Sequence, residues 1–101
     1  MADNLDKASF EPHLNEKFKV HPQGMAPVEV QLVDITDKSS DSVENFSLMF
    51  RGPLDPVFRH NTHRVRHAKL GEFDLFLGPV TTGKTDGVYY QAVFNRFRKN
   101  R

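Results

Sequence analysis

Apolar and polar residues alternate along most of this chain, and a period of two residues is typical of a β-strand with one buried face. Clusters of Gly, Pro, Asp and Ser separate the alternating runs and supply the turns between strands. The pattern therefore predicts strands over residues 17–20, 28–35, 45–51, 73–77 and 88–95.

The second of these runs contains a change of phase. Its apolar residues fall on alternate positions up to Leu32, and the next ones are Val33 and Ile35. An extra residue in one strand of an antiparallel pair produces such a change. We expect a β-bulge near Leu32 and Val33, or a strand that is buried on both faces there.

Residues 55–70 allow two interpretations. Asp55-Pro56 resembles the start of a helix and Gly71 its end, which favours a helix. The apolar residues between them are too sparse to form a helical stripe. We favour a loop over residues 52–62 and a strand over residues 63–68.

One helical turn is predicted before the first strand. Ser9 is a suitable capping residue, Pro12 is tolerated in a first turn, and Phe10 and Leu14 fall on one face. We expect this turn to close one end of a barrel.

The chain has 101 residues, which is enough for a single domain. Successive strands without helices between them favour an all-β fold: a single antiparallel β-barrel, connected as a meander, or a two-layer sandwich. We expect about six strands, the short N-terminal helical turn, and one domain over residues 1–101 with flexible ends at residues 1–8 and 98–101.

Composition excludes several chemistries. Cysteine is absent, which rules out disulfides, thiolate nucleophiles and cysteine-based metal sites. The N-terminus has neither the basic nor the apolar part of a signal peptide, and no stretch reaches the roughly 18 apolar residues of a membrane span. A cytoplasmic protein is the default expectation.

Charge is distributed unevenly although the net charge is only +1. Residues 1–50 contain four Lys and nine acidic residues, whereas residues 51–101 contain ten Lys and Arg and four acidic residues. A basic face with aromatic side chains is typical of nucleic-acid-binding barrels. The alternative is that these cations protect a strand edge and keep the C-terminus soluble, and the low net charge favours it. The candidate polyanion-binding residues are Arg59, Arg64, Arg66, Arg96 and Arg98.

The segment GPVTTGKT at residues 78–85 matches the phosphate-binding loop of nucleotide hydrolases. Such a loop requires a helix directly after it, because the helix N-terminus holds the phosphates. Residues 86–94 are instead β-branched, aromatic and alternating. We predict a hairpin loop with left-handed turn positions at Gly83 and at Asp86-Gly87, and with Lys84 in solvent.

Three histidines, His60, His63 and His67, suggest a metal site. On a strand, His63 and His67 share a face but lie roughly 13 Å apart, too far for one ion. On a helix all three share a face. Because we favour the strand, we expect solvated or singly hydrogen-bonded histidines and no metal site.

The segments KFKV, VEVQLVDI, FSLMFRGP, HAKLGEFDLFLGPV and YYQAVFNR, in this order after Phe10 and Leu14, resemble a family of small bacterial domains of unknown function. The similarity covers nearly the whole chain. It implies an all-β domain and a strand over residues 63–68, and it carries no activity, cofactor or catalytic residue.

No nucleophile elbow and no carboxylate pair with catalytic spacing is present, so we expect no catalytic residue, cofactor or metal. The expected function is that of a non-enzymatic interaction or structural module. Its partner would be an unknown protein or a second copy bound through a strand edge. A barrel that binds nucleic acid or another polyanion is the alternative.

Overall fold

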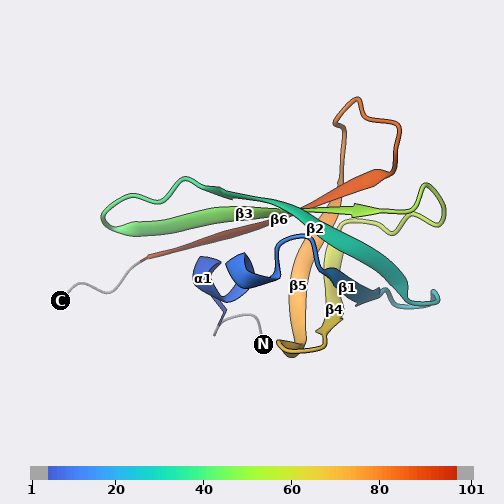
Figure 1. The fold of residues 1–101 in the computed structure, drawn as a ribbon, viewed down its shortest axis with the longest axis horizontal. Coiled ribbons are helices and arrows are strands. Elements are labelled where there is room, and N and C mark those ends of the chain that lie inside the picture. Colours follow the sequence, from blue (N-terminus) through green and yellow to red (C-terminus); the bar gives the residue numbers. More distant parts are fainter. Residues whose placement is uncertain (1–4, 98–101) are drawn as a thin grey trace.

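The computed structural model describes residues 5–97, with side chains through residue 95. It is mostly β, with six strands and a short helical segment before them (Figure 1). The elements are α1 (Lys7–Phe10), the 3-10 turn η2 (Glu11–His13), β1 (Lys17–His21), β2 (Val28–Asp37), β3 (Val43–Gly52), β4 (Asn61–His67), β5 (Gly71–Val80) and β6 (Val88–Phe97).

The strands close into an antiparallel barrel in the order β1-β2-β3-β6-β5-β4, with β4 pairing back to β1. The predicted all-β barrel is confirmed. The predicted meander is wrong at one connection, because β3 is followed along the chain by β4 but pairs with β6. Residues 53–60 make this connection across one end of the barrel, where the side chain of Phe58 is 1% exposed and stacks on Tyr90.

The two interpretations of residues 55–70 are resolved in favour of the strand. β4 spans Asn61–His67 and alternates between exposed and buried side chains, as a strand with one face in the core does. The bulge is confirmed too, since the pairing of β2 with β3 shifts register between Leu32 and Asp34.

The helical turn closes the other end of the barrel, as predicted. Phe10 on α1 is fully buried and its ring lies within 6.4 Å of four other phenylalanine rings, those of Phe18, Phe46, Phe73 and Phe94. The capping residue is Asp6 rather than Ser9: the Asp6 carboxylate accepts from the Ser9 N–H, and the Ser9 hydroxyl accepts from the Asp6 N–H. Ser9 is therefore the N3 residue of a capping box. Leu14, expected on the same face as Phe10, is 42% exposed.

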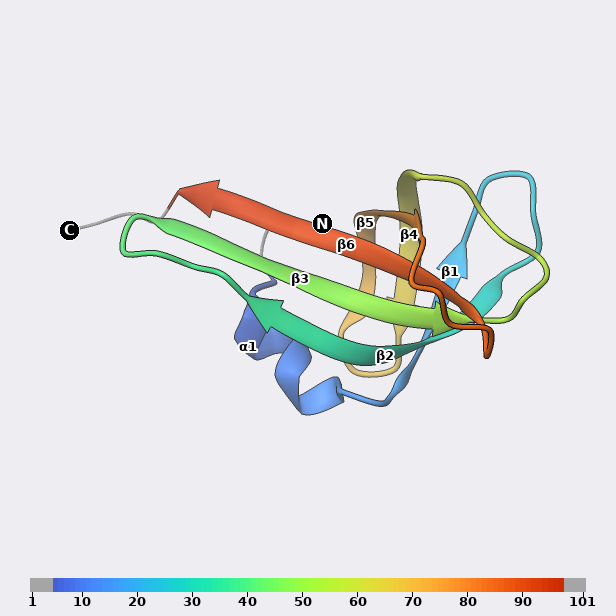
Figure 2. The same ribbon diagram turned by 90° about the horizontal axis from the view of Figure 1, so that it is seen from above.

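A three-stranded arm extends from the barrel. β2 and β6 flank β3, and all three run past α1 to the end where the β2–β3 hairpin lies (Figures 1 and 2). We call residues 33–37 of β2, 43–48 of β3 and 93–97 of β6 the arm. The molecule is accordingly elongated, with extents of 46 × 29 × 23 Å. None of the described helices is long or apolar enough to cross a membrane.

Candidate functional site

The loop that matches a phosphate-binding motif has none of the required structure. β5 ends at Val80, and the chain from Val88 onward is the strand β6. Gly83 has a φ of +79°, as expected for a turn, but Asp86 and Gly87 do not adopt a left-handed conformation. Lys84 is exposed, as predicted, and its ammonium lies 5.5 Å from the centre of the Tyr89 ring. Within the described residues, no helix N-terminus faces this loop.

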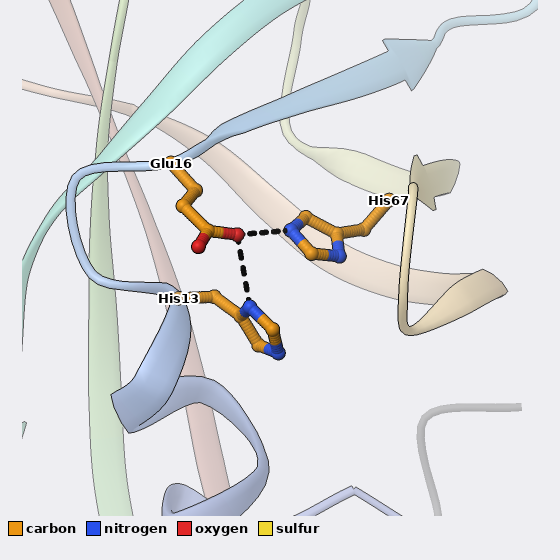
Figure 3. Close-up of side chains that lie close together, drawn as sticks. All are labelled: His13, Glu16 and His67. Carbon is orange, nitrogen blue, oxygen red and sulfur yellow. Dashed lines mark hydrogen bonds and ion pairs between the residues drawn. The ribbon is translucent and has the colours of Figure 1, made fainter.

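A cluster of ionisable side chains lies instead where the N-terminal turn meets the barrel (Figure 3). Glu16, just before β1, accepts hydrogen bonds at Oε1 from His13 Nδ1 at 2.9 Å and from His67 Nε2 at 2.8 Å. His13 comes from η2 and His67 from the end of β4. The three ligand-type atoms lie within 4.8 Å of one another, close enough to suggest a metal site.

The hydrogen bonds of His67 argue against metal coordination. Its Nδ1 accepts from the backbone N–H groups of Lys69 and Leu70, at 3.1 and 3.2 Å. A neutral imidazole has one N–H, so these two donors assign the proton to Nε2. Binding of a metal at Nε2 would move that proton to Nδ1, directly against the two backbone donors. No lone pair of His67 is then free for a metal ion or for general base catalysis.

The cluster is well suited to hold the N-terminal turn on the barrel. The pKa of Glu16 is lowered, first by the hydrogen bond from His13 and then by the one from His67. The ionised carboxylate therefore links η2 to β4 through two charge-assisted hydrogen bonds. The His67 side chain is 3% exposed, and its ring lies 4.5 Å from the Phe18 ring, so this link reaches the edge of the core.

Of the three histidines expected to be solvated or singly hydrogen-bonded, His60 is exposed and His63 makes one hydrogen bond, whereas His67 is hydrogen-bonded through both ring nitrogens. His63 and His67 both face inward and are 7% and 5% exposed. His63 donates from Nε2 to the Arg59 carbonyl oxygen and packs edge-on against Phe58. Sequence reasoning missed His13 and Glu16 as partners of His67, because Glu16 and His67 are 51 residues apart and meet only where β4 closes the barrel on β1.

Of the five candidate polyanion-binding residues, the structure describes the side chains of Arg59, Arg64 and Arg66. Arg64 and Arg66 lie on the outer face of β4, where Arg64 binds Asp74 at 2.8 Å and Glu72 at 3.1 Å, and Arg66 binds Glu72. These ion pairs lower the pKa of Glu72 and raise that of Arg64. Because each of the two arginines already has an acidic partner, their charge toward a polyanion is reduced.

Arg59 is exposed in the loop before β4. Arg96 pairs through its backbone with Glu44 in the arm, and Arg98 lies outside the described residues. Polyanion binding by these residues stays a prediction.

The outer surface where β5 and β6 separate is the remaining candidate site. The two strands pair from Leu77 opposite Ala92 to Val80 opposite Tyr89. The next step of this register places Phe76 opposite Val93, and these two side chains are 59% and 57% exposed. We call them the apolar pair. Exposed large apolar side chains that adjoin one another are typical of protein contact surfaces.

The edge of β6 beyond the apolar pair is open. From Val93 to Phe97, β6 pairs with β3 and with no other strand among the described residues. Half of the backbone N–H and C=O groups of such an edge point away from the sheet and are able to pair with another chain. A strand edge was expected as a contact surface, but its place in the sheet could not be located from the sequence.

Comparison with known proteins identifies a family and does not assign an activity. No curated protein and no solved structure matches the chain. A family model described as Domain of unknown function (DUF6916) matches residues 5–94, which include β1 to β5, most of β6 and the cluster of His13, Glu16 and His67. The chain therefore belongs to this family of small domains of unknown function.

Proposed function

We propose that this domain is a non-enzymatic interaction module that binds a protein partner by strand addition to the open edge of β6. The observation that carries the proposal is the coincidence of this edge with the apolar pair, Phe76 and Val93. Strand addition uses main-chain hydrogen bonds for affinity and side-chain contacts on the sheet face for specificity. The edge of β6 offers the main-chain groups, and the adjoining apolar pair offers the side-chain contacts.

The His13–Glu16–His67 cluster supports a non-enzymatic role, because its hydrogen bonds serve the fold. Both nitrogens of His67 are engaged, and the carboxylate of Glu16 accepts from two histidines. A general acid or base has to exchange protons with a substrate, and His67 has no lone pair available for that exchange. Turnover of ester or phosphate substrates that is lost in Glu16→Gln would contradict this part of the proposal.

Site-specific photo-cross-linking in the native cells tests the binding surface. Asn95 is exposed on the open edge and is replaced by a photoreactive phenylalanine. Lys19 is the control position: it is also exposed, but its strand β1 is paired on both sides. We expect a discrete cross-linked product from position 95 and none from position 19. Equal cross-linking at the two positions, or none at position 95, would contradict the proposal.

Binding of nucleic acid is the alternative function, and the ion pairs of Arg64 and Arg66 with Glu72 weaken its support. Because phosphate contacts release counterions, such binding falls steeply as salt is raised. A salt-sensitive shift of a labelled single-stranded oligonucleotide at micromolar protein would favour this alternative over strand addition.

A further inference from the structure

A groove lies beside the buried Phe58, at the end of the barrel that residues 53–60 cover. One wall is the loop between β1 and β2, at residues 22–25, and the other is formed by residues 57–63, which lead into β4. The groove has a volume of about 240 Å³. Pockets for drug-sized ligands measure about 300–1,000 Å³, so this one has room for a smaller group, such as a single amino-acid residue.

Both walls of the groove carry an apolar side chain. Met25 comes from the β1–β2 loop and Val57 from the connection before β4, and they are 36% and 46% exposed. Phe58, which also lines the groove, is buried. Exposed apolar side chains around one hollow are typical of a contact surface. An apolar ligand group placed between Met25 and Val57 would remove part of both side chains from water, which favours binding.

His63 offers a hydrogen-bond acceptor to the groove. Its Nε2 contacts the Arg59 carbonyl oxygen at 2.8 Å, and because a carbonyl oxygen accepts, the proton of the neutral ring is on Nε2. Nδ1 therefore carries a lone pair. Within the described part of the chain Nδ1 has no hydrogen-bond partner, and it is not one of the fully enclosed polar atoms. Since His63 lines the groove, this lone pair is open to a donor from a ligand.

Arg59 gives the groove its positive charge. The side chain is exposed, so it lies at the rim, and it has no acidic partner within residues 5–95. No acidic residue lines the groove. Arg59 differs in this from Arg64 and Arg66, whose guanidinium groups are held by acidic partners on β5. A guanidinium offers two parallel N–H donors that match the two oxygens of a carboxylate.

We propose that the groove binds the C-terminal residue of a peptide that ends in an apolar side chain such as that of leucine. The apolar side chain lies between Met25 and Val57, the terminal carboxylate binds the Arg59 guanidinium, and the N–H of the same residue donates to His63 Nδ1. Capture of a C-terminal carboxylate is a recurring mode of peptide recognition. The groove shares no residue with the open edge of β6 or with the apolar pair, so this inference goes beyond the proposed function.

The acceptor on His63 selects a peptide terminus over a fatty acid. A fatty acid has an apolar part and a carboxylate but no N–H, and it would leave the lone pair of Nδ1 without a donor. An internal peptide segment has N–H groups but no carboxylate for Arg59. A C-terminal residue offers the side chain, the carboxylate and the N–H together.

Three small probes test the three contacts. N-acetyl-leucine carries the apolar side chain, one N–H next to it and the carboxylate. N-acetyl-leucinamide lacks the carboxylate, and isocaproate has the same side chain and carboxylate but no N–H. Titration of the isotope-labelled protein, followed through its amide signals by NMR, measures each Kd and locates the site. We expect N-acetyl-leucine to shift the amides of residues 23–25 and 57–63 with a Kd on the order of 1 mM.

The other two probes should bind at least about tenfold more weakly, because each leaves a polar group of the groove unpaired. His63 is 7% exposed and packs on Phe58, so isocaproate tests its role without a change in the core.

A pair of variants tests the carboxylate contact. Arg59→Gln removes one exposed positive charge at the groove, and Lys19→Gln is the matched control, because Lys19 is exposed on β1 and does not line the groove. We expect Arg59→Gln to weaken N-acetyl-leucine about tenfold, to the affinity of its amide, and Lys19→Gln to leave the Kd unchanged. Circular dichroism checks that both variants are folded.

Several results would overturn the inference. Equal affinities of N-acetyl-leucine and its amide, or an unchanged Kd in Arg59→Gln, would remove the carboxylate contact. Equal affinities of N-acetyl-leucine and isocaproate would assign the groove to a fatty acid. Shifts outside the groove, or no saturable shift at about ten times the expected Kd, would remove the site. The cross-link from position 95 is independent of all these results and decides separately on the open edge of β6.

Discussion

At the scale of single residues, His67 shows how this small barrel accommodates a buried polar side chain. Burial of an unpaired polar group costs free energy, and hydrogen bonds to both ring nitrogens offset that cost. Glu16 accepts from one nitrogen, and two backbone N–H groups donate to the other. The arrangement fixes the tautomer and, through Glu16, attaches His13 and the N-terminal turn.

The contribution of Glu16 to stability depends on pH. Its folded-state pKa is lowered from an ordinary value of 4.5, chiefly by the hydrogen bond from His13. A carboxyl group of this kind stabilises the fold above its unfolded pKa, and the contribution is lost as pH falls through the folded pKa. We expect Glu16→Gln to lower the Tm at pH 7, and the difference from wild type to disappear below the folded pKa. A difference in Tm that stays constant from pH 7 to acid would contradict this.

Core and loop positions should respond very differently to truncation. Leu75 is 4% exposed in the core, and Leu75→Ala should reduce the free energy of unfolding by about 2–5 kcal/mol. The Lys84 side chain is exposed and lies over the Tyr89 ring, so Lys84→Ala should change the free energy of unfolding by less than about 1 kcal/mol. Urea unfolding measures both. A similar loss in the two variants would contradict the core assignment.

At the scale of elements, local sequence was sufficient to predict the strands. Alternation identified the buried faces of β1, β2, β3, β5 and β6, and the phase change at Leu32 identified the bulge. The strand β4 was harder, because its inward residues include His63 and His67, which do not look apolar in the sequence. Their burial depends on hydrogen bonds, of His63 to the Arg59 carbonyl oxygen and of His67 to the distant Glu16, which an apolar pattern does not contain.

The pairings between strands far apart along the chain could not be predicted from the sequence. β3 pairs with β6 and β1 with β4, and both pairings depend on residues 53–60 crossing the barrel end with Phe58 beneath them. The same limit applies to the cluster of His13, Glu16 and His67. The open edges were unpredictable for a related reason, since they exist only where β5 leaves β6 and β1 leaves β2.

The glycines of the phosphate-loop match have structural roles in the hairpin. A Cβ added at Gly78 would lie 2.1 Å from Cγ and 2.6 Å from Cα of His60, so a backbone atom would have to move. We expect Gly78→Ala to lower the Tm clearly. Thr81→Ala, at an exposed position of the same hairpin, is the control and should leave the Tm unchanged. A tolerated Gly78→Ala would mean that β5 and the His60 loop are not in contact.

At the scale of the whole molecule, the fold combines a closed barrel with an arm that is open on both sides. Phe10 fills one end of the barrel and Phe58 fills the other, and packed apolar side chains occupy the interior. The surfaces available for function are therefore on the outside. A closed barrel removes sheet edges, but beyond the barrel β2 and β6 each pair on one side only among the described residues.

The open edge of β6 is the central claim, and amide hydrogen exchange followed by NMR tests it most directly. β6 is paired on both sides over residues 89–92 and on one side over residues 93–97. In dilute protein we predict slow exchange for every amide of the first segment and fast exchange for alternate amides of the second. Uniformly slow exchange through residue 97 in dilute protein would show that the edge is already covered and would contradict the account.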